Sequence, residues 1–145
     1  MELSLWYEAD IPLLHKETMT ALLERIGPSV IQSVAGPVAG ENYHIILTSQ
    51  EFIRQLNRDF RQRDCVTDVL SFPLGSGDEI TGEIYICWER VNSQAVEYEH
   101  SWQREFSYLL IHGILHLLGY EHGDGPNPAM RNMEETILEK IEMGR

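Results

Sequence analysis

The sequence predicts an α/β (α+β) fold, in which a small mixed sheet of about four strands packs with about five helices in a single domain over residues 1–145. Short runs rich in β-branched and aromatic residues predict the strands, and longer segments with apolar residues at helical spacing predict the helices. The chain is 43% hydrophobic and 23% charged, which is ordinary for a globular protein. No stretch reads as a linker between two domains.

The N-terminal segment predicts a strand followed by a helix. Residues 3–7 alternate and are rich in strand formers, so they form the first expected strand. Asp10 is the expected helix cap, with Pro12 in the first turn of the helix. Gly27-Pro28 is expected to interrupt this helix.

A second strand and helix follow a Gly- and Pro-containing loop. Residues 44–48 are apolar enough for an interior strand. Thr48 and Glu51 have the spacing of a capping box, and the apolar side of the following helix extends to Phe60.

The next two predicted strands lie close together in the chain. Residues 69–72 predict a third strand ended by Pro73, and residues 84–88 predict a fourth. The turn cluster at 75–79 makes a short connection, which favours antiparallel pairing of these two strands. The first three strands are joined by helices, which favours parallel pairing among them.

The C-terminal part is predicted to be helical. The pattern is helical over residues 89–119, with a break near 99–101 where Ser101 is the expected cap of the second helix. An irregular loop over 123–128 then leads to a last amphipathic helix over 130–141.

The helix that Ser101 is expected to cap carries two histidines in an apolar surrounding. His112 and His116 are four residues apart, so both rings lie on one helical face. Gly119 is expected to end the helix in the left-handed conformation, which lets the chain turn back and bring His122 beside the pair. A catalytic zinc site typically has three protein ligands, such as three imidazoles, and leaves the fourth coordination position open. We therefore expect one Zn²⁺ per chain, bound by His112, His116 and His122.

The histidine spacing is also that of the metzincin proteases, but one residue does not fit. Their general-base glutamate would fall at position 113, and this chain has Gly113 there. The missing carboxylate makes peptide hydrolysis the weaker interpretation.

Basic residues are concentrated in one short segment of an acidic chain. The net charge of −12 argues against a protein that binds nucleic acid over its whole surface. Four of the 11 Lys and Arg residues nevertheless lie within ten positions: Arg54, Arg58, Arg61 and Arg63. The cluster is typical either of a solvated helix face or of a local contact with phosphate, which suits the planar guanidinium.

Several segments together resemble one protein family. His-Gly-Ile-Leu-His-Leu-Leu-Gly-Tyr-Glu-His at 112–122 closely resembles the signature of the YbeY family, bacterial metal-dependent endoribonucleases linked to ribosomal RNA maturation. The usual family form ends Gly-Tyr-Asp-His, so Glu121 is a conservative departure. Residues 56–61 and 67–73 resemble a second family signature, and residues 82–86 a third, weaker one.

The resemblance implies a function and roles for particular residues. It implies a single-strand-specific endoribonuclease with a zinc ion bound by three histidines, acting in maturation of small-subunit ribosomal RNA and in ribosome quality control. The partners implied are single-stranded ribosomal RNA and the ribosome or small-subunit assembly proteins. Arg61 matches the catalytic arginine, and Arg58 and Arg63 are further candidates for binding substrate phosphate. Asp68 is either an acceptor for a ligand imidazole, a base or a cap at a strand start.

Two other functions remain open at this point. One is a metallohydrolase acting on peptides or small amides, and the other is a non-catalytic ribosome-assembly factor with a structural zinc. No apolar run reaches the roughly 20 residues of a membrane helix, and no leader begins the chain, so we expect a cytoplasmic protein without membrane contact. The two cysteines form no Cys-x-x-Cys pattern and predict neither a disulfide framework nor a cysteine metal site.

Overall fold

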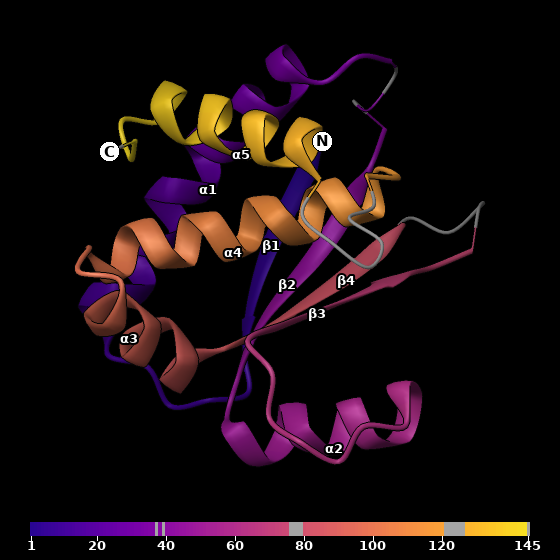
Figure 1. Ribbon diagram of the computed structural model, residues 1–145, viewed down its shortest axis with the longest axis vertical. Coiled ribbons are helices and arrows are strands. Elements are labelled where there is room, and N and C mark those ends of the chain that lie inside the picture. Colours follow the sequence, from indigo (N-terminus) through magenta and orange to yellow (C-terminus); the bar gives the residue numbers. More distant parts are fainter. Residues whose placement is uncertain (37, 39, 76–79, 121–126, 145) are drawn as a thin grey trace.

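The computed structural model describes residues 1–36, 38, 40–75, 80–120 and 127–144. Within these residues there are four strands: β1 (Glu2–Tyr7), β2 (Asn42–Thr48), β3 (Val69–Pro73) and β4 (Gly82–Cys87). The helices of the same residues are α1 (Leu13–Ser33), α2 (Gln50–Arg61), α3 (Trp88–Glu97), α4 (Trp102–Leu117) and α5 (Pro128–Lys140). The predicted α/β fold with a small mixed sheet is confirmed (Figure 1).

The sheet has the strand order β1-β2-β4-β3. β2 pairs in parallel with β1 and β4, and β3 lies at the edge and pairs antiparallel with β4. The antiparallel pairing of the third and fourth strands is therefore confirmed. Parallel pairing holds between β1 and β2 but does not extend to β3, because β4 lies between β2 and β3.

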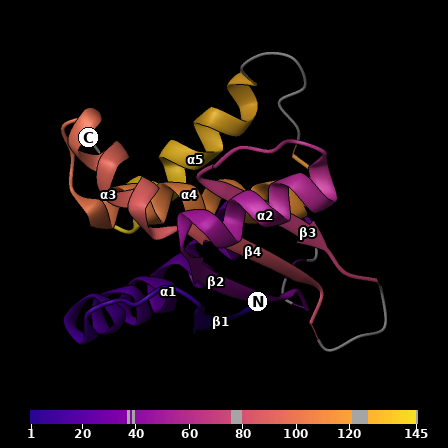
Figure 2. The ribbon, with the colours of Figure 1, turned by 90° about the horizontal axis from the view of Figure 1, so that it is seen from below.

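The helices form a thick layer on one face of the sheet and a thin one on the other. α1, α4 and α5 pack together on one side (Figure 1), and Ile84 and Ile86 of β4 point into this core and are fully buried. Tyr85, between them, points to the opposite face, where its ring stacks on Phe52 of α2. Figure 2 shows α2 lying over the β4 and β3 side of that face.

Helix α1 differs from the prediction both at its N-terminal cap and at the expected interruption. Asp10 does not cap it, because the helix begins later, with Pro12 as its N-cap residue and no side-chain cap. Gly27-Pro28 does not interrupt it, since Pro28 lies inside a continuous helix. The buried residues Ile26 and Val30 flank Pro28 on the core side, and their packing outweighs the loss of one main-chain hydrogen bond.

Three other boundaries are shifted. The N-cap of α2 is Ser49, whose hydroxyl accepts a hydrogen bond from the main-chain N–H of Phe52, so the expected capping box of Thr48 and Glu51 is wrong. Pro73 belongs to β3 instead of following it. Trp88 begins α3 instead of ending the fourth strand.

The main chain of β3 alternates between bonding to β4 and facing outward. The N–H of Cys87 donates to the carbonyl oxygen of Asp68, and the N–H of Leu74 donates to Thr81. In an antiparallel pair, such hydrogen-bonded positions recur at every second residue. Positions 69, 71 and 73 therefore turn their main-chain groups to the open edge, where Pro73 has no N–H to leave unpaired.

Both ends of α4 follow the prediction. The hydroxyl of Ser101 accepts a hydrogen bond from the N–H of Arg104, as an N-cap does. Gly119 has φ 101°, and its N–H donates to the carbonyl oxygen of His116. The N–H of Tyr120 donates to Leu115, which completes a Schellman motif. The last helical residue is thus Leu117, and the left-handed residue Gly119 follows two positions later.

Parts of the three predicted loop segments lie outside the described residues, as do Glu121 and His122. The last helix begins at Pro128, two residues earlier than predicted, with Asn127 as its N-cap. Among the described residues, none of the helices is both long enough and apolar enough to cross a membrane.

Candidate metal site and nucleic-acid interface

The two histidines of α4 converge on each other. The Nε2 atoms of His112 and His116 are 3.1 Å apart, and their ring planes are 82° from parallel. Both rings come from one face of α4, as the four-residue spacing predicts. Among the described residues no three ligand side chains gather around one point, and His122, the third predicted ligand, lies outside them.

A buried carboxylate holds the ring of His112. Oε2 of Glu134, in α5, is 2.8 Å from Nδ1 of His112. The Glu134 side chain is only 5% exposed, so its charge needs the imidazole N–H as a partner. With a hydrogen atom on Nδ1, the ring directs its Nε2 lone pair toward His116, and a carboxylate on the other ring nitrogen is the usual arrangement for a metal-bound histidine.

The geometry of the pair fits a zinc ion. Two nitrogens bound to tetrahedral zinc at 2.0–2.1 Å are about 3.3 Å apart, close to the 3.1 Å between the two Nε2 atoms. Imidazole nitrogens are ordinary zinc ligands, and the Glu134 carboxylate fixes the orientation of the His112 ring. His112 and His116 would therefore hold zinc, with His122 as the predicted third ligand.

The surroundings of the pair carry negative charge. The ring of Tyr108 lies 5.9 Å from the His112 ring, centroid to centroid. Burial, and then the nearby carboxylates of Glu134, Asp68 and Glu105, raise the pKa of Tyr108 to about 12. The phenol is therefore protonated at neutral pH. The negative charge of the carboxylates near Tyr108 favours a cation at the neighbouring histidines.

Gly113 lies where α4 packs tightly against the sheet. A Cβ atom at this position would be 2.9 Å from Cγ2 of Ile84 and 3.0 Å from Oγ of Ser71. The position that a metzincin protease uses for its general base is therefore filled here by the packing of helix against sheet. A glutamate side chain has no room there.

The predicted catalytic arginine lies at the open edge of the sheet, next to the histidine helix. Arg61 is in the last turn of α2, and its Nη2 donates to the carbonyl oxygen of Ser71, 2.8 Å away. The guanidinium also lies over the ring of Phe72, 5.1 Å from its centroid. The hydroxyl of the same Ser71 lies 3.3 Å from the carbonyl oxygen of Gly113. One residue of β3 therefore links Arg61 to the residue that follows His112.

The other predicted side chains have different surroundings. Arg58 is exposed and pairs with Asp59 at 3.3 Å, and Arg63 is exposed beyond the end of α2. Oδ1 of Asp68 accepts a hydrogen bond from the N–H of Val69, and Oδ2 accepts one from Gln94. The structure thus places the Asp68 carboxylate as a cap at a strand start, while Glu134 is the acceptor beside the His112 imidazole.

Glu134 was not among the site residues predicted from the sequence, although the sequence contains a pattern that indicates a buried, paired acid at this position. It lies at helical spacing between Met130 and Ile137 or Ile141, all three of them buried. A carboxylate within the apolar stripe of an amphipathic helix has to find a buried partner. That signal predicts a paired acid, although it does not say which residue is the partner.

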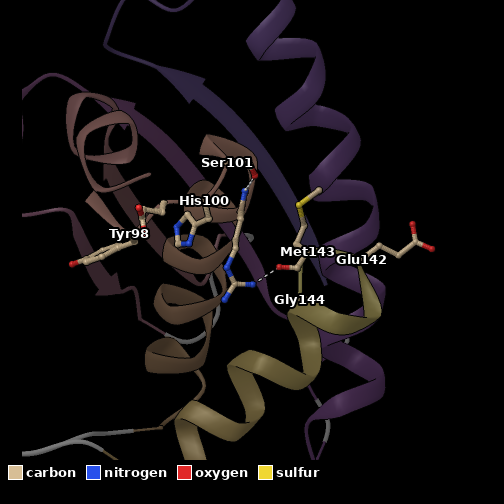
Figure 3. Close-up of a pocket in the computed structure, with 8 residues that line it drawn as sticks. Tyr98, His100, Ser101, Glu142, Met143 and Gly144 are labelled. Carbon is tan, nitrogen blue, oxygen red and sulfur yellow. Dashed lines mark hydrogen bonds between the residues drawn. The ribbon is translucent and has the colours of Figure 1, made fainter. Parts of the chain in front are cut away.

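A separate hollow lies at the other end of α4. It is lined by Tyr98, His100 and Ser101 of the α3–α4 connection and by Met143 near the C-terminus (Figure 3). The guanidinium of Arg104 closes it by donating to the carbonyl oxygen of Met143 and pairing with Glu135 at 3.3 Å. These contacts fasten the end of the chain to the first turn of α4. Arg104 lies eight residues before His112, about 12 Å along the helix axis.

The fold and the histidine pair together define a class: an α/β protein with a candidate histidine metal site on a buried helix next to an edge strand. Comparison with known proteins gives the family within this class. Residues 10–142 match the family model described as Endoribonuclease YbeY. The chain belongs to this family.

Individual relatives agree with the family match. The chain is 46% identical to the Endoribonuclease YbeY of Finegoldia magna over 108 residues, covering 70% of this chain and 71% of the relative. It is 39% identical to that of Clostridioides difficile over 140 residues, covering 89% and 92%. The solution structure of TM1509 from Thermotoga maritima superimposes with a TM-score of 0.69 at 30% identity, covering 96% of this chain and 88% of that one.

Proposed function

We propose that this protein is an endoribonuclease that hydrolyses single-stranded RNA with one zinc ion bound by His112, His116 and His122. The observation that carries the proposal is the approach of the two Nε2 atoms to 3.1 Å, with the Glu134 carboxylate behind one of the rings. The family name and the arginine cluster of α2 support RNA as the substrate.

The histidines and Glu134 have positioning roles in this proposal. Glu134 accepts a hydrogen bond from Nδ1 of His112, and so keeps Nε2 of that ring deprotonated and directed at His116. Zinc, when bound, activates water for attack on phosphorus and withdraws charge from a phosphate oxygen. No carboxylate at position 113 is required for this chemistry.

Arg61 is the residue that we propose to stabilise the transition state. Phosphodiester hydrolysis adds negative charge to the phosphate, and a guanidinium can form two parallel hydrogen bonds with it. One Arg61 nitrogen is held by the Ser71 carbonyl, which fixes the group at the sheet edge beside α4. Arg58 and Arg63 are exposed nearby and would bind flanking phosphates.

We further propose that the RNA is small-subunit ribosomal RNA, cleaved during its maturation and during ribosome quality control in the cytoplasm. The ribosome or its small-subunit assembly proteins would then be the partners. This part of the proposal rests on the likeness of residues 56–61, 67–73 and 112–122 to the family signatures.

The test combines metal analysis with an RNA cleavage assay. Zinc-loaded protein should contain about one zinc per chain and cleave a single strand derived from ribosomal RNA, but not casein. His116→Ala should lose both the metal and the activity. His44→Ala is the matched control, because His44 lies on β2 beside Trp6, away from α4.

Three outcomes would contradict the proposal. Full zinc content in His116→Ala would remove that residue from the ligands. Zinc-loaded wild-type protein that leaves RNA intact would favour a structural zinc in an assembly factor. Cleavage of casein in place of RNA would favour the peptide hydrolase, against the geometry at Gly113.

A further inference from the structure

Four aromatic rings form a row on the sheet face that points away from the core. Phe52 and Phe60 belong to α2, Phe72 to β3 and Tyr85 to β4. The ring centroids of Phe60 and Phe72 are 5.6 Å apart, those of Phe72 and Tyr85 are 5.8 Å apart, and those of Tyr85 and Phe52 are 6.1 Å apart. We call these four residues the aromatic row.

The outer end of the aromatic row is exposed. Phe60 is 63% exposed, whereas Ile53 of the same helix is fully buried and fastens α2 to the rest of the molecule. A phenyl ring that remains in water to this extent adds little to the packing of α2. Its edge contact with the Phe72 ring leaves much of its surface accessible to a ligand.

The exposed end of the row coincides with the basic segment of the chain. The Arg61 guanidinium lies over the ring of Phe72, and Arg58 is in the same last turn of α2. Arg58 pairs with Asp59, but both side chains are about half exposed, so the pair is weak and can exchange for a phosphate. In a chain of net charge −12, aromatic and cationic groups meet here on one exposed surface.

The row and the histidine helix lie on opposite faces of the sheet, and β3 connects them at the open edge. Phe72 follows Ser71 in β3, and Ser71 contacts Arg61 through its carbonyl group and Gly113 through its hydroxyl group. A strand of RNA whose phosphate reaches Arg61 therefore has the Phe60 and Phe72 rings within reach of an adjoining base.

We propose that Phe60, backed at an angle by the Phe72 ring and flanked by Arg61, forms a subsite that stacks one nucleobase of a single-stranded RNA on the exposed Phe60 ring, next to the phosphate held by Arg61. The inference rests on the proposed function and adds to it a binding site for the base. Every base has a π-face, so such a site tolerates different sequences but requires an unpaired base. The subsite thus accounts for selection of single strands.

Binding of a non-cleavable RNA tests this subsite separately from catalysis. The probe is an unstructured, fluorescently labelled 2′-O-methyl oligoribonucleotide of about 12 nucleotides, and its Kd for the full chain is measured by anisotropy. Phe60→Ala should raise Kd about 5- to 150-fold, the equivalent of about 1–3 kcal/mol for one stacked base. Phe60→Leu should weaken binding similarly, because it keeps an apolar side chain but has no π-face. Phe60→Trp should bind about as tightly as wild type.

Trp6→Ala is the matched control. Trp6 is 54% exposed on the same face of the sheet, but on β1 at the opposite edge. Its removal should leave Kd unchanged. A second control is a probe with abasic positions, which keeps its phosphates. Phe60→Ala should bind this probe as wild type does, and all variants should melt near the wild-type temperature.

The outcomes separate this inference from the proposed function. If wild-type protein binds the RNA and Phe60→Ala or Phe60→Leu binds it equally well, the base subsite is wrong and the row only packs α2 or meets another protein. If Phe60→Ala loses the same affinity for the abasic probe, stacking is also excluded. If wild-type protein does not bind the RNA, both the subsite and the proposed function fail.

Discussion

The hydroxyl of Ser71 lies 3.3 Å from the carbonyl oxygen of Gly113, where the edge strand packs tightly against the histidine helix. The contact fixes the height of His112 above the sheet, because Gly113 is the next residue. On the β3 side, Ser71 binds Arg61 of α2 through its carbonyl oxygen, and on the α4 side Gly113 is next to the imidazole pair.

The first prediction concerns this contact. Gly113→Ala puts a Cβ 2.9 Å from Cγ2 of Ile84, so the helix and the sheet must move apart. Overpacking costs about 1–3 kcal/mol, and the gain in helix propensity returns about 0.5–1 kcal/mol, so we expect a net loss of up to about 2.5 kcal/mol in the free energy of unfolding. Urea unfolding measures it.

The control for that prediction is Gly40→Ala, because a Cβ at Gly40 would meet nothing within 4 Å. It should leave stability nearly unchanged. Gly113→Glu, the larger substitution, should unfold more easily still and should not hydrolyse casein. Wild-type stability of Gly113→Ala would contradict the tight packing at this position, because separating the helix from the sheet would then cost no more than the gain in helix propensity.

The second prediction concerns the carboxylate behind His112. Glu134→Gln keeps the size of the side chain but removes its charge, so the His112 ring is held less firmly and the negative charge beside the bound metal is lost. We expect zinc affinity to fall about 10- to 100-fold, measured by competition with a chelating dye. Glu135→Gln is the control, since Glu135 pairs with Arg104 instead. Equal zinc affinities of the two variants would contradict the role of Glu134.

The third prediction separates the charge of Arg61 from its shape. Arg61→Lys keeps the charge but loses the planar fork and the stacking over Phe72. Loss of one charge-assisted contact in the transition state costs about 2–4 kcal/mol, or roughly 30- to 1000-fold in single-turnover cleavage rate. Zinc content and melting temperature should stay near wild type.

Arg54→Lys is the control for Arg61, because Arg54 is exposed and pairs with Asp64. It should cleave at nearly the wild-type rate. If Arg61→Lys is as fast as wild type, or slows only in proportion to lost zinc, Arg61 is structural and the phosphate contact lies elsewhere, with Arg58 and Arg63 the nearest candidates.

The fourth prediction concerns the two thiols. Burial raises the pKa of the Cys87 thiol, so a smaller fraction of Cys87 is thiolate at a given pH than for an exposed cysteine. Cys65 is exposed. A thiol reagent at pH 8 should therefore modify Cys65 quickly and Cys87 only on unfolding, and Cys65→Ser should abolish the fast phase. Two equal fast phases in the native protein would show that the β4 end opens readily.

Local patterns in the sequence predicted much of the fold and of the histidine pair. The four-residue spacing of His112 and His116 and the turn at Gly119 depend only on helix geometry, so both could be read directly. Pro28 was misread because burial of Ile26 and Val30 against distant elements outweighs a local preference.

Contacts between distant segments could not be predicted in this way. Glu134 and His112 are 22 residues apart, and Ser71 and Gly113 are 42 apart. Each pair meets only because α4 packs between α5 and the sheet. The sequence shows only that position 113 lacks the glutamate of a protease. The reason for a glycine there is the close approach of α4 to Ile84, which is visible only in the folded structure.

The open edge of β3 bears on how this protein behaves at high concentration. A second molecule could extend the sheet only by finding free N–H and C=O groups in alternation at positions 69, 71 and 73. The N–H of Val69 is already bound by the Asp68 carboxylate, the carbonyl oxygen of Ser71 is bound by Arg61, and Pro73 has no N–H. One group is thus used or missing at each outward position, so the edge next to the candidate site resists cross-β aggregation while its side chains stay accessible.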